Sequence, residues 1–374
     1  MPIILIPLVL YALYNLERWV FGNYWDKGLS ACLQFEEQAV VEGEKAQLNE
    51  IITNRNFLPL HILQVSFQTD KGIMFGEDTN VSVSDRVNVA DVFSLRFYEK
   101  ITRQLDVFCT RRGYYSILKT SLKASDLFSP DIRYTTFDQH TNLYVYPTML
   151  PVTKTEVPFR QLMGEVLSKR FLYEDNFTYR GIRDYAPTDP QTYINWKATA
   201  RTGDLKVNLH DYTSSQEVRL VLNVDEPGIL FETELLEDCI RLTLSLAVRL
   251  TEKNIPVSLL TNGRDKVAGD LIQLAAGSSA SHITSFKRAL ARIDLGQTEA
   301  NSMESLVEKE VEASDTAQLT YCYISTSKGE DAVSAARRLA DKQGKLLWLC
   351  PLTREMDTDR PDISRLDFQV IIHE

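Results

Sequence analysis

The sequence predicts a multidomain chain of α and β structure: an N-terminal membrane helix, a β-sandwich-like domain and an α/β domain with a doubly wound sheet. Three observations predict this class. A nearly continuous apolar segment opens the chain, residues 29–150 contain period-two stretches, and residues 216–374 alternate between strand-like and helix-like segments. The predicted domains are therefore 1–25, 29–150 and 216–374, with residues 151–215 as a connector.

The first segment, "PIILIPLVLYALYNL", is apolar or aromatic from Ile3 to Tyr14. A helix that continued from Ile3 to Trp25 would reach about 34 Å, which is enough to cross the hydrocarbon core of a bilayer. This length predicts a single membrane anchor. Because Pro7 interrupts the run, a buried core helix or an N-terminal strand is the alternative.

The residues around this segment predict its orientation. Trp19, Tyr24 and Trp25 would suit the membrane–water interface. Arg18 and Lys27 follow the apolar run and no basic residue precedes it, which favours a cytoplasmic location for the rest of the chain. The expected localisation is the cell membrane, as a single-pass protein with its other domains in the cytoplasm.

Turn-forming triplets divide the second region into short strands: "EGE" at 42–44, "NRN" at 54–56, "DKG" at 70–72 and "RRG" at 111–113. Between them, apolar residues recur at every second position, as in Phe93, Leu95 and Phe97. No long helical period interrupts this region. The pattern is typical of a β-sandwich.

The third region alternates strand and helix. "EVRLVLNVD", "PVSLLTNG", "QLTYCYIST" and "KLLWLCPL" are short apolar runs of the kind that form strands buried on both faces. Helices are expected from about Glu232 to Lys253, in "SHITSFKRALARIDLG" and in "GEDAVSAARRLADKQG". Short links between strands and helices predict a mostly parallel sheet.

Composition limits the classes of function. The chain has 374 residues and a net charge of −10, so it has no general electrostatic reason to approach nucleic acid, and no nucleic-acid partner is expected. Its five cysteines are scattered without a C-x-x-C pair, and we expect buried thiols rather than a metal cluster or a disulfide framework.

The first strand of the α/β region ends in "LNVDEPG", where a von Willebrand A fold carries the Mg²⁺-binding sequence D-x-S-x-S. The corresponding positions here are Asn223, Asp225 and Pro227. Proline offers no side-chain ligand and both serines are missing, so we expect a von Willebrand A-like domain with a degenerate site, no bound metal and no cofactor. A divalent-cation-dependent binding module of that type is the alternative.

Motifs for nucleotide binding and nucleophilic catalysis are missing. The sequence has neither G-x-x-x-x-G-K-[ST] nor a G-x-G-x-x-G after a strand, and none of the five histidines lies in a catalytic motif. We therefore predict no catalytic residue and no enzymatic activity.

One stretch, "RGIRDYAPTDPQTYINWKATAR" at 180–201, concentrates charge around Trp196. Its carboxylates, Asp184 and Asp189, could act as general acid and base, and a hydrolase that uses them is a second alternative. Its acidic and basic residues are close to balance, which favours a salt-bridged junction or a surface for a protein partner.

The same stretch resembles the core motif of the family called domain of unknown function 58. That motif runs roughly R-x-Y-x-x-G-D-x-x-R-x-I-x-W-x-x-[ST]-A-R. The matching residues are Arg183, Tyr185, Asp189, Ile194, Trp196, Thr199, Ala200 and Arg201. Thr188 replaces the usual glycine and Thr192 the usual arginine, which removes one expected salt-bridge partner.

The resemblance extends along most of the chain, through "VEGEKAQLNEIITNRNFLPL" and "RRGYYSI". It implies a membrane anchor, a β domain, a von Willebrand A-like domain and a partner among the MoxR-type AAA+ ATPases. The implied function is that of a membrane-anchored, non-enzymatic adaptor in protein assembly or maturation. The residues expected to form its docking or bracing motif are Arg183, Tyr185, Asp189, Ile194, Trp196, Lys197 and Arg201.

Overall fold

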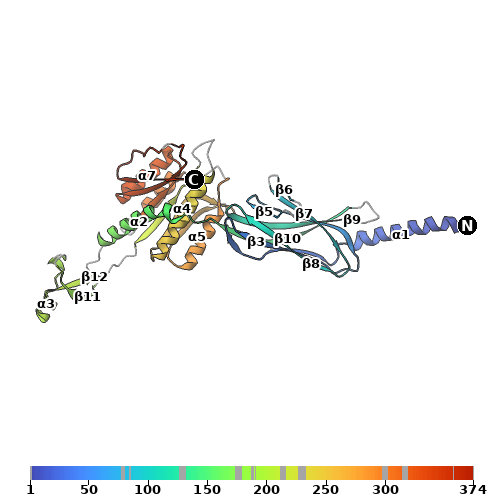
Figure 1. Ribbon diagram of the computed structural model, residues 1–374, viewed down its shortest axis with the longest axis horizontal. Helices are drawn as coiled ribbons and strands as arrows, with labels where there is room; N and C mark the ends of the chain where they lie inside the picture. The colour runs from blue at the N-terminus through green and yellow to red at the C-terminus, as the bar shows by residue number, and fades with distance from the viewer. Residues whose placement is uncertain are drawn as a thin grey trace. The chain divides into compact units, whose positions relative to one another are not determined.

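The computed structural model describes residues 2–76, 81–83, 86–125, 132–172, 179–186, 189, 191–210, 216–225, 233–296, 302–313, 319–356 and 358–373. The chain divides into two compact units, Met1–Thr148 and Met149–Glu374 (Figure 1).

The first unit consists of helix α1 (Pro2–Tyr24) and two β-sheets. The four-stranded sheet has the order β1-β3-β8-β5: Leu29–Phe35, Lys45–Asn54, Lys100–Cys109 and Ile73–Phe75. The six-stranded sheet has the order β2-β10-β9-β4-β7-β6: Ala39–Val41, Ile132–Tyr146, Gly113–Ser125, Leu60–Thr69, Val87–Leu95 and Val81–Val83. Among the described strands, the pairings within these sheets are antiparallel except that of β2 with β10, which is parallel.

Strict alternation of apolar and polar residues builds the interior of this unit, as in β1, where every second residue is buried. Two separate apolar clusters result. One, the Leu48 cluster, includes Val89 and Leu105. The other, the Trp25 cluster, includes Ile52, and Phe21 and Trp25 attach the end of α1 to it.

Helix α1 corrects the expectation of a membrane anchor. Among the residues that the structure describes, no helix is both long enough and apolar enough to cross a membrane. The predicted membrane helix at 1–25 and the single-pass cell-membrane localisation are therefore wrong. The physical reason lies in the sequence: the uninterrupted apolar part, Ile3–Tyr14, gives only about 18 Å of helix before Asn15, Glu17 and Arg18 follow.

The second unit begins with α2 (Val152–Leu172) and contains a seven-stranded sheet. Its order is β15-β14-β13-β17-β18-β19: Leu271–Gly277, Val257–Asp265, Glu217–Leu222, Leu319–Ile324, Leu346–Leu352 and Leu366–Ile372. β14, β13, β17, β18 and β19 are parallel, whereas β15 and the short β16 (Ile293–Asp294) are antiparallel to β14.

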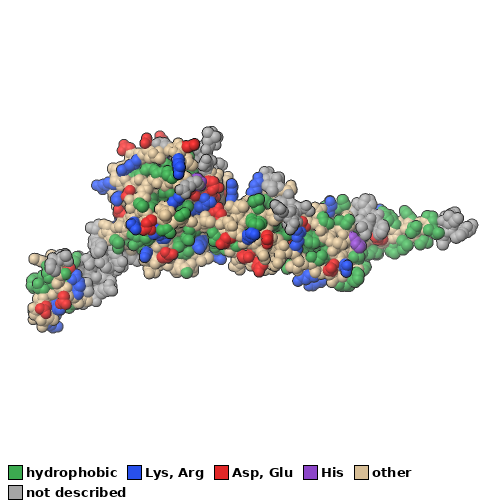
Figure 2. All heavy atoms as spheres, in the orientation of Figure 1, with side chains coloured by type: hydrophobic (Ala, Val, Ile, Leu, Met, Phe, Trp, Pro, Cys, Tyr) green, Lys and Arg blue, Asp and Glu red, His purple; other side chains and the backbone are tan. Residues whose placement is uncertain are grey.

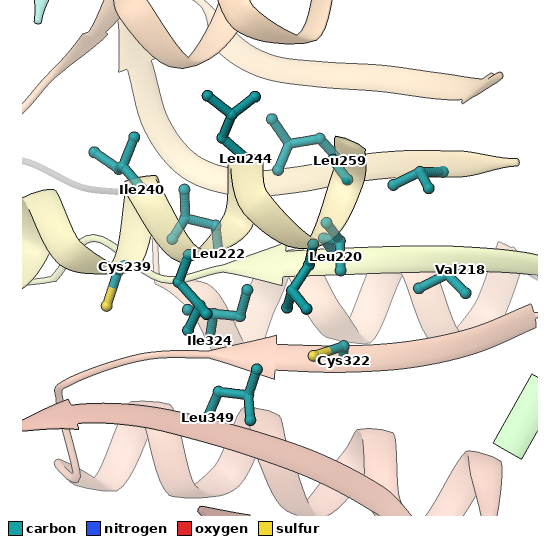
Figure 3. Packing of buried hydrophobic residues seen from close by; sticks show 14 of the residues in the cluster. Val218, Leu220, Leu222, Cys239, Ile240, Leu244, Leu259, Cys322, Ile324 and Leu349 are labelled. Carbon is teal, nitrogen blue, oxygen red and sulfur yellow. The ribbon is translucent and has the colours of Figure 1, made fainter. Parts of the chain in front are cut away.

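Helices cover both faces of this sheet: α4 (Thr233–Glu252), α5 (Ala280–Arg292), α6 (Met303–Ala313) and α7 (Glu330–Gln343). On one face, Leu220 and Leu222 of β13 pack with Cys239 and Ile240 of α4 (Figure 3). On the other face, Val221 belongs to a cluster formed with α6 and α7. The central strand is therefore buried on both sides, which explains its continuous apolar sequence.

A smaller substructure, here called the hairpin module, comprises residues 179–210. It contains antiparallel strands β11 (Tyr179–Asp184) and β12 (Lys206–His210), a 3-10 turn η1 (Gln191–Tyr193) and helix α3 (Trp196–Thr202). The segment predicted as a connector thus contains a long helix, α2, and this module. More of the described chain is strand than helix, and together with the failed membrane helix this overturns the predicted fold class.

Candidate functional site

An ion pair closes the turn that follows β11. Arg183 Nη1 donates to Asp189 Oδ2 at 2.6 Å, and Nη2 donates to Oδ1 at 2.6 Å. The backbone N–H of Ala186 also donates to Asp189 Oδ2, at 2.8 Å. The Arg183 hydrogen bonds, followed by that of Ala186, lower the pKa of Asp189 to about 2. Asp189 is therefore ionised at neutral pH, where its carboxylate stabilises the turn and is a poor proton donor.

The second carboxylate of the stretch pairs with a different basic side chain. Asp184 forms an ion pair with Lys206, its direct cross-strand neighbour in the β11–β12 ladder. Sequence reasoning missed Lys206 because it follows Asp184 by many residues and meets it only when the hairpin forms. Each of the two carboxylates has its own basic partner, so the geometry gives no support to a shared acid–base pair.

Helix α3 is held at both ends. Asn195 Oδ1 accepts a hydrogen bond from the N–H of Ala198 at 2.9 Å, which caps the first turn. Gly203 ends the helix with a φ of 83°, and its N–H donates to the Thr199 carbonyl. Thr199 Oγ1 accepts from the N–H of Lys206 at 3.0 Å, so the inner side of the helix is fixed to β12.

The outer side of α3 is left to solvent. We define the α3 face as Trp196, Lys197, Ala200 and Arg201, all of which are exposed. Neighbouring positions of this set are one or three residues apart, and all four fall within a single arc of the helix. Trp196 is 68% exposed, and neither Lys197 nor Arg201 forms an ion pair with any described residue. Figure 2 shows hydrophobic and charged side chains next to one another on this module.

The remaining motif residues support the module. Ile194 is half-buried and bridges to Val207 of β12, and the N–H of Tyr185 donates to the Leu205 carbonyl at 3.0 Å. Thr192 is exposed, whereas Thr188 lies outside the described residues.

A second polar group lies where β13 and β14 end. Asn262 Nδ2 donates to Asn223 Oδ1 at 2.9 Å and to Asp225 Oδ1 at 2.7 Å. Asn262 Oδ1 accepts from the N–H of Val224 at 2.9 Å, and Asn223 Nδ2 contacts the hydroxyls of Tyr323 and Ser325, each at 3.2 Å. Sequence reasoning missed Asn262, which occupies the neighbouring strand.

The Asn262 amide thus donates to the side-chain oxygen of Asn223 and to one of the two carboxylate oxygens of Asp225. Burial, followed by the nearby Asp331 carboxylate, raises the pKa of Asp225 to about 6. Pro227 lies outside the described residues, and within those described no three His, Cys, Asp or Glu side chains are placed to hold a metal.

No family model matches this chain, and no curated protein matches it. Among solved structures, it is similar to the CARDB domain of a Pyrococcus furiosus protein in complex with di-metal ions, with 12% identity and a TM-score of 0.19 over 32% of this chain and 96% of that one. It is also similar to a non-cellulosomal cohesin from Archaeoglobus fulgidus, with 7% identity and a TM-score of 0.22 over 31% of this chain and 91% of that one.

A cohesin module from a Clostridium perfringens family 33 glycoside hydrolase gives 9% identity and a TM-score of 0.21 over 31% of this chain and 98% of that one. At these values the similarity assigns no function. The neighbours are cohesin and CARDB domains rather than von Willebrand A domains, so the von Willebrand A-like assignment of residues 216–374 gains no support from them.

Proposed function

We propose that this protein is a non-enzymatic adaptor that binds a partner protein through the α3 face. The observation that carries the proposal is the 68% exposure of Trp196 on a helix whose caps and inner side are fixed by hydrogen bonds. Tryptophan and arginine dominate the binding energy of many protein interfaces, and a preformed surface loses little conformational entropy on binding.

The charge of the α3 face indicates the chemistry of the partner. Lys197 and Arg201 carry two positive charges next to Trp196, in a chain whose net charge is −10. Because no described residue neutralises them by an ion pair, an acidic surface with an apolar depression for the indole would complement them.

The resemblance of residues 183–201 to the domain of unknown function 58 suggests a MoxR-type AAA+ ATPase as that partner. The Arg183–Asp189 ion pair supports this role indirectly, because it holds the turn that precedes η1 and α3. In this proposal, Arg183, Tyr185, Asp189 and Ile194 support the module, and the α3 face makes the contacts.

The test is the affinity of the full chain for the purified MoxR-type ATPase of the same organism, measured by titration calorimetry. We expect Trp196→Ala to weaken binding about 30-fold, equivalent to about 2 kcal/mol, and Arg201→Ala to weaken it less. Val267→Ala removes a side chain that is 56% exposed elsewhere in the second unit and should leave the affinity unchanged. Equal affinities for all four proteins would exclude the α3 face as the docking surface.

A further inference from the structure

A buried acid lies on β3 of the first unit. Glu50 is 1% exposed, and neither of its carboxylate oxygens has a hydrogen-bond partner among the described residues. Its neighbours across the four-stranded sheet are Leu33 on β1 and Arg103 on β8. Arg103 binds Asp91 of β7 at 2.8 Å, and Asp91 is itself 4% exposed. Asp91 and Arg103 are the charged groups that act on Glu50.

These three side chains mark the boundary between the two apolar clusters. On β3, Glu50 stands between Leu48 of the Leu48 cluster and Ile52 of the Trp25 cluster, all three pointing inward.

The other two strands repeat this order. On β7, Asp91 stands between Val89 of the Leu48 cluster and Phe93, which packs against the Trp25 cluster. On β8, Arg103 stands between Leu105 and Ile101 in the same way. Three strands from both sheets therefore place an ionisable residue at the same level, and we call Glu50, Asp91 and Arg103 the polar layer.

The charge of Glu50 depends on this layer. An ionised carboxylate without hydrogen bonds is costly in an apolar interior. Burial raises the pKa of Glu50, the Asp91 charge raises it further and Arg103 lowers it, with a net value of about 7 against an ordinary 4.5. The folded unit therefore binds a proton in a pH range where the unfolded chain has released it.

We propose that the polar layer is a pH-dependent switch. It stabilises the closed β-sandwich while Glu50 is protonated and destabilises the closed β-sandwich when Glu50 releases its proton to solvent. Protonated Glu50 carries no charge, so the Arg103–Asp91 pair is the only charged pair of the layer. After deprotonation, two carboxylates share one guanidinium between the sheets. In this state, water enters the interior with the smallest free-energy penalty at the boundary between the Leu48 and Trp25 clusters.

The direction of the pH effect follows from the raised pKa. Stability from the proton is complete below the unfolded value of about 4.5 and is lost as the pH rises through about 7. Between pH 6 and pH 8, the equilibrium for opening of the sandwich should increase about tenfold.

Hydrogen–deuterium exchange of the full chain tests this pH-dependent opening, with labelling times scaled for the pH dependence of chemical exchange. Peptides that cover β3, β7 and β8 should lose protection about tenfold from pH 6 to pH 8, whereas peptides from α4 serve as the internal reference. In Glu50→Gln, which imitates the protonated acid, protection should stay within about twofold over this range. Asp106→Asn, at an exposed carboxylate of β8, should behave as the unmodified chain.

A second variant covers the case that Glu50→Gln does not fold. Asp91→Asn removes the repelling charge and frees Arg103 for Glu50, so the loss of protection should move to lower pH. The proposal is overturned if the unmodified chain keeps its protection from pH 6 to pH 8, if Glu50→Gln loses it equally, or if Asp91→Asn leaves the midpoint unchanged.

Discussion

At the scale of single residues, an amide occupies the place where the sequence raised the question of a metal ion. Asn262 is fully buried and satisfies Asn223, Asp225 and the N–H of Val224 at once. Because an amide has both donors and an acceptor, it can link a carboxylate, a second amide and the backbone without introducing charge. The strand ends are thereby joined by hydrogen bonds.

Loss of this amide should be costly. Asn262→Ala leaves Asn223 and the N–H of Val224 short of partners in a buried site, and we expect a loss of about 2–3 kcal/mol in the free energy of unfolding. Urea denaturation followed by the fluorescence of the buried Trp348 would measure it. Asn142→Ala, at an exposed asparagine, should change stability by less than about 0.5 kcal/mol. A similar small change for Asn262→Ala would show that the network is not structural.

Residue contacts could be anticipated from the sequence only where they are local. Arg183 and Asp189 lie six positions apart in one charged stretch, so spacing suggests an ion pair. Lys206 and Asn262 could not be anticipated, because each meets its partner across a strand pairing that one sequence does not define. Glu50 escaped notice for a related reason: its inward orientation follows from the register of β3.

At the scale of elements, α3 is a short helix that depends on its caps. Seven residues are too few for a stable isolated helix, so Asn195, Gly203 and the contact of Thr199 with β12 must stabilise it. This support explains how Trp196 can remain exposed without disordering the helix.

Gly203→Ala tests that dependence. A methyl group at this position meets no atom within 4 Å, but the φ of 83° is unfavourable for alanine. We expect a local cost of about 1 kcal/mol and about fivefold faster amide exchange in α3. Gly164→Ala is the matched control: it also meets no atom, lies within α2 and should strengthen that helix. Unchanged exchange in α3 would mean that the cap contributes little.

Periodicity predicted elements well where one face is strongly apolar. The helix expected at about 232–253 is α4, Thr233–Glu252, and the one expected in "SHITSFKRALARIDLG" is α5. It failed for α2, whose apolar residues form a weak stripe and whose interior contains Pro158.

At the scale of the whole molecule, the pattern of apolar residues predicted a membrane helix, a β-sandwich-like domain and an α/β domain, and the membrane helix is wrong. The total length of the N-terminal segment predicts a membrane span, but polar and charged residues follow its apolar part after about 18 Å of helix. The motif in the predicted connector marks where the hairpin module lies, but the motif residues alone did not reveal the β11–β12 hairpin that carries them.

The central claim is that the α3 face is where a MoxR-type AAA+ ATPase binds. The most direct measurement is site-specific photo-crosslinking between the full chain and the purified ATPase, with a benzophenone side chain in place of Lys197 or, as the control, of the exposed Val267. We predict an ATPase crosslink from position 197 that Trp196→Ala abolishes, and none from position 267. No crosslink from position 197, or equal yields from both positions, would contradict the account.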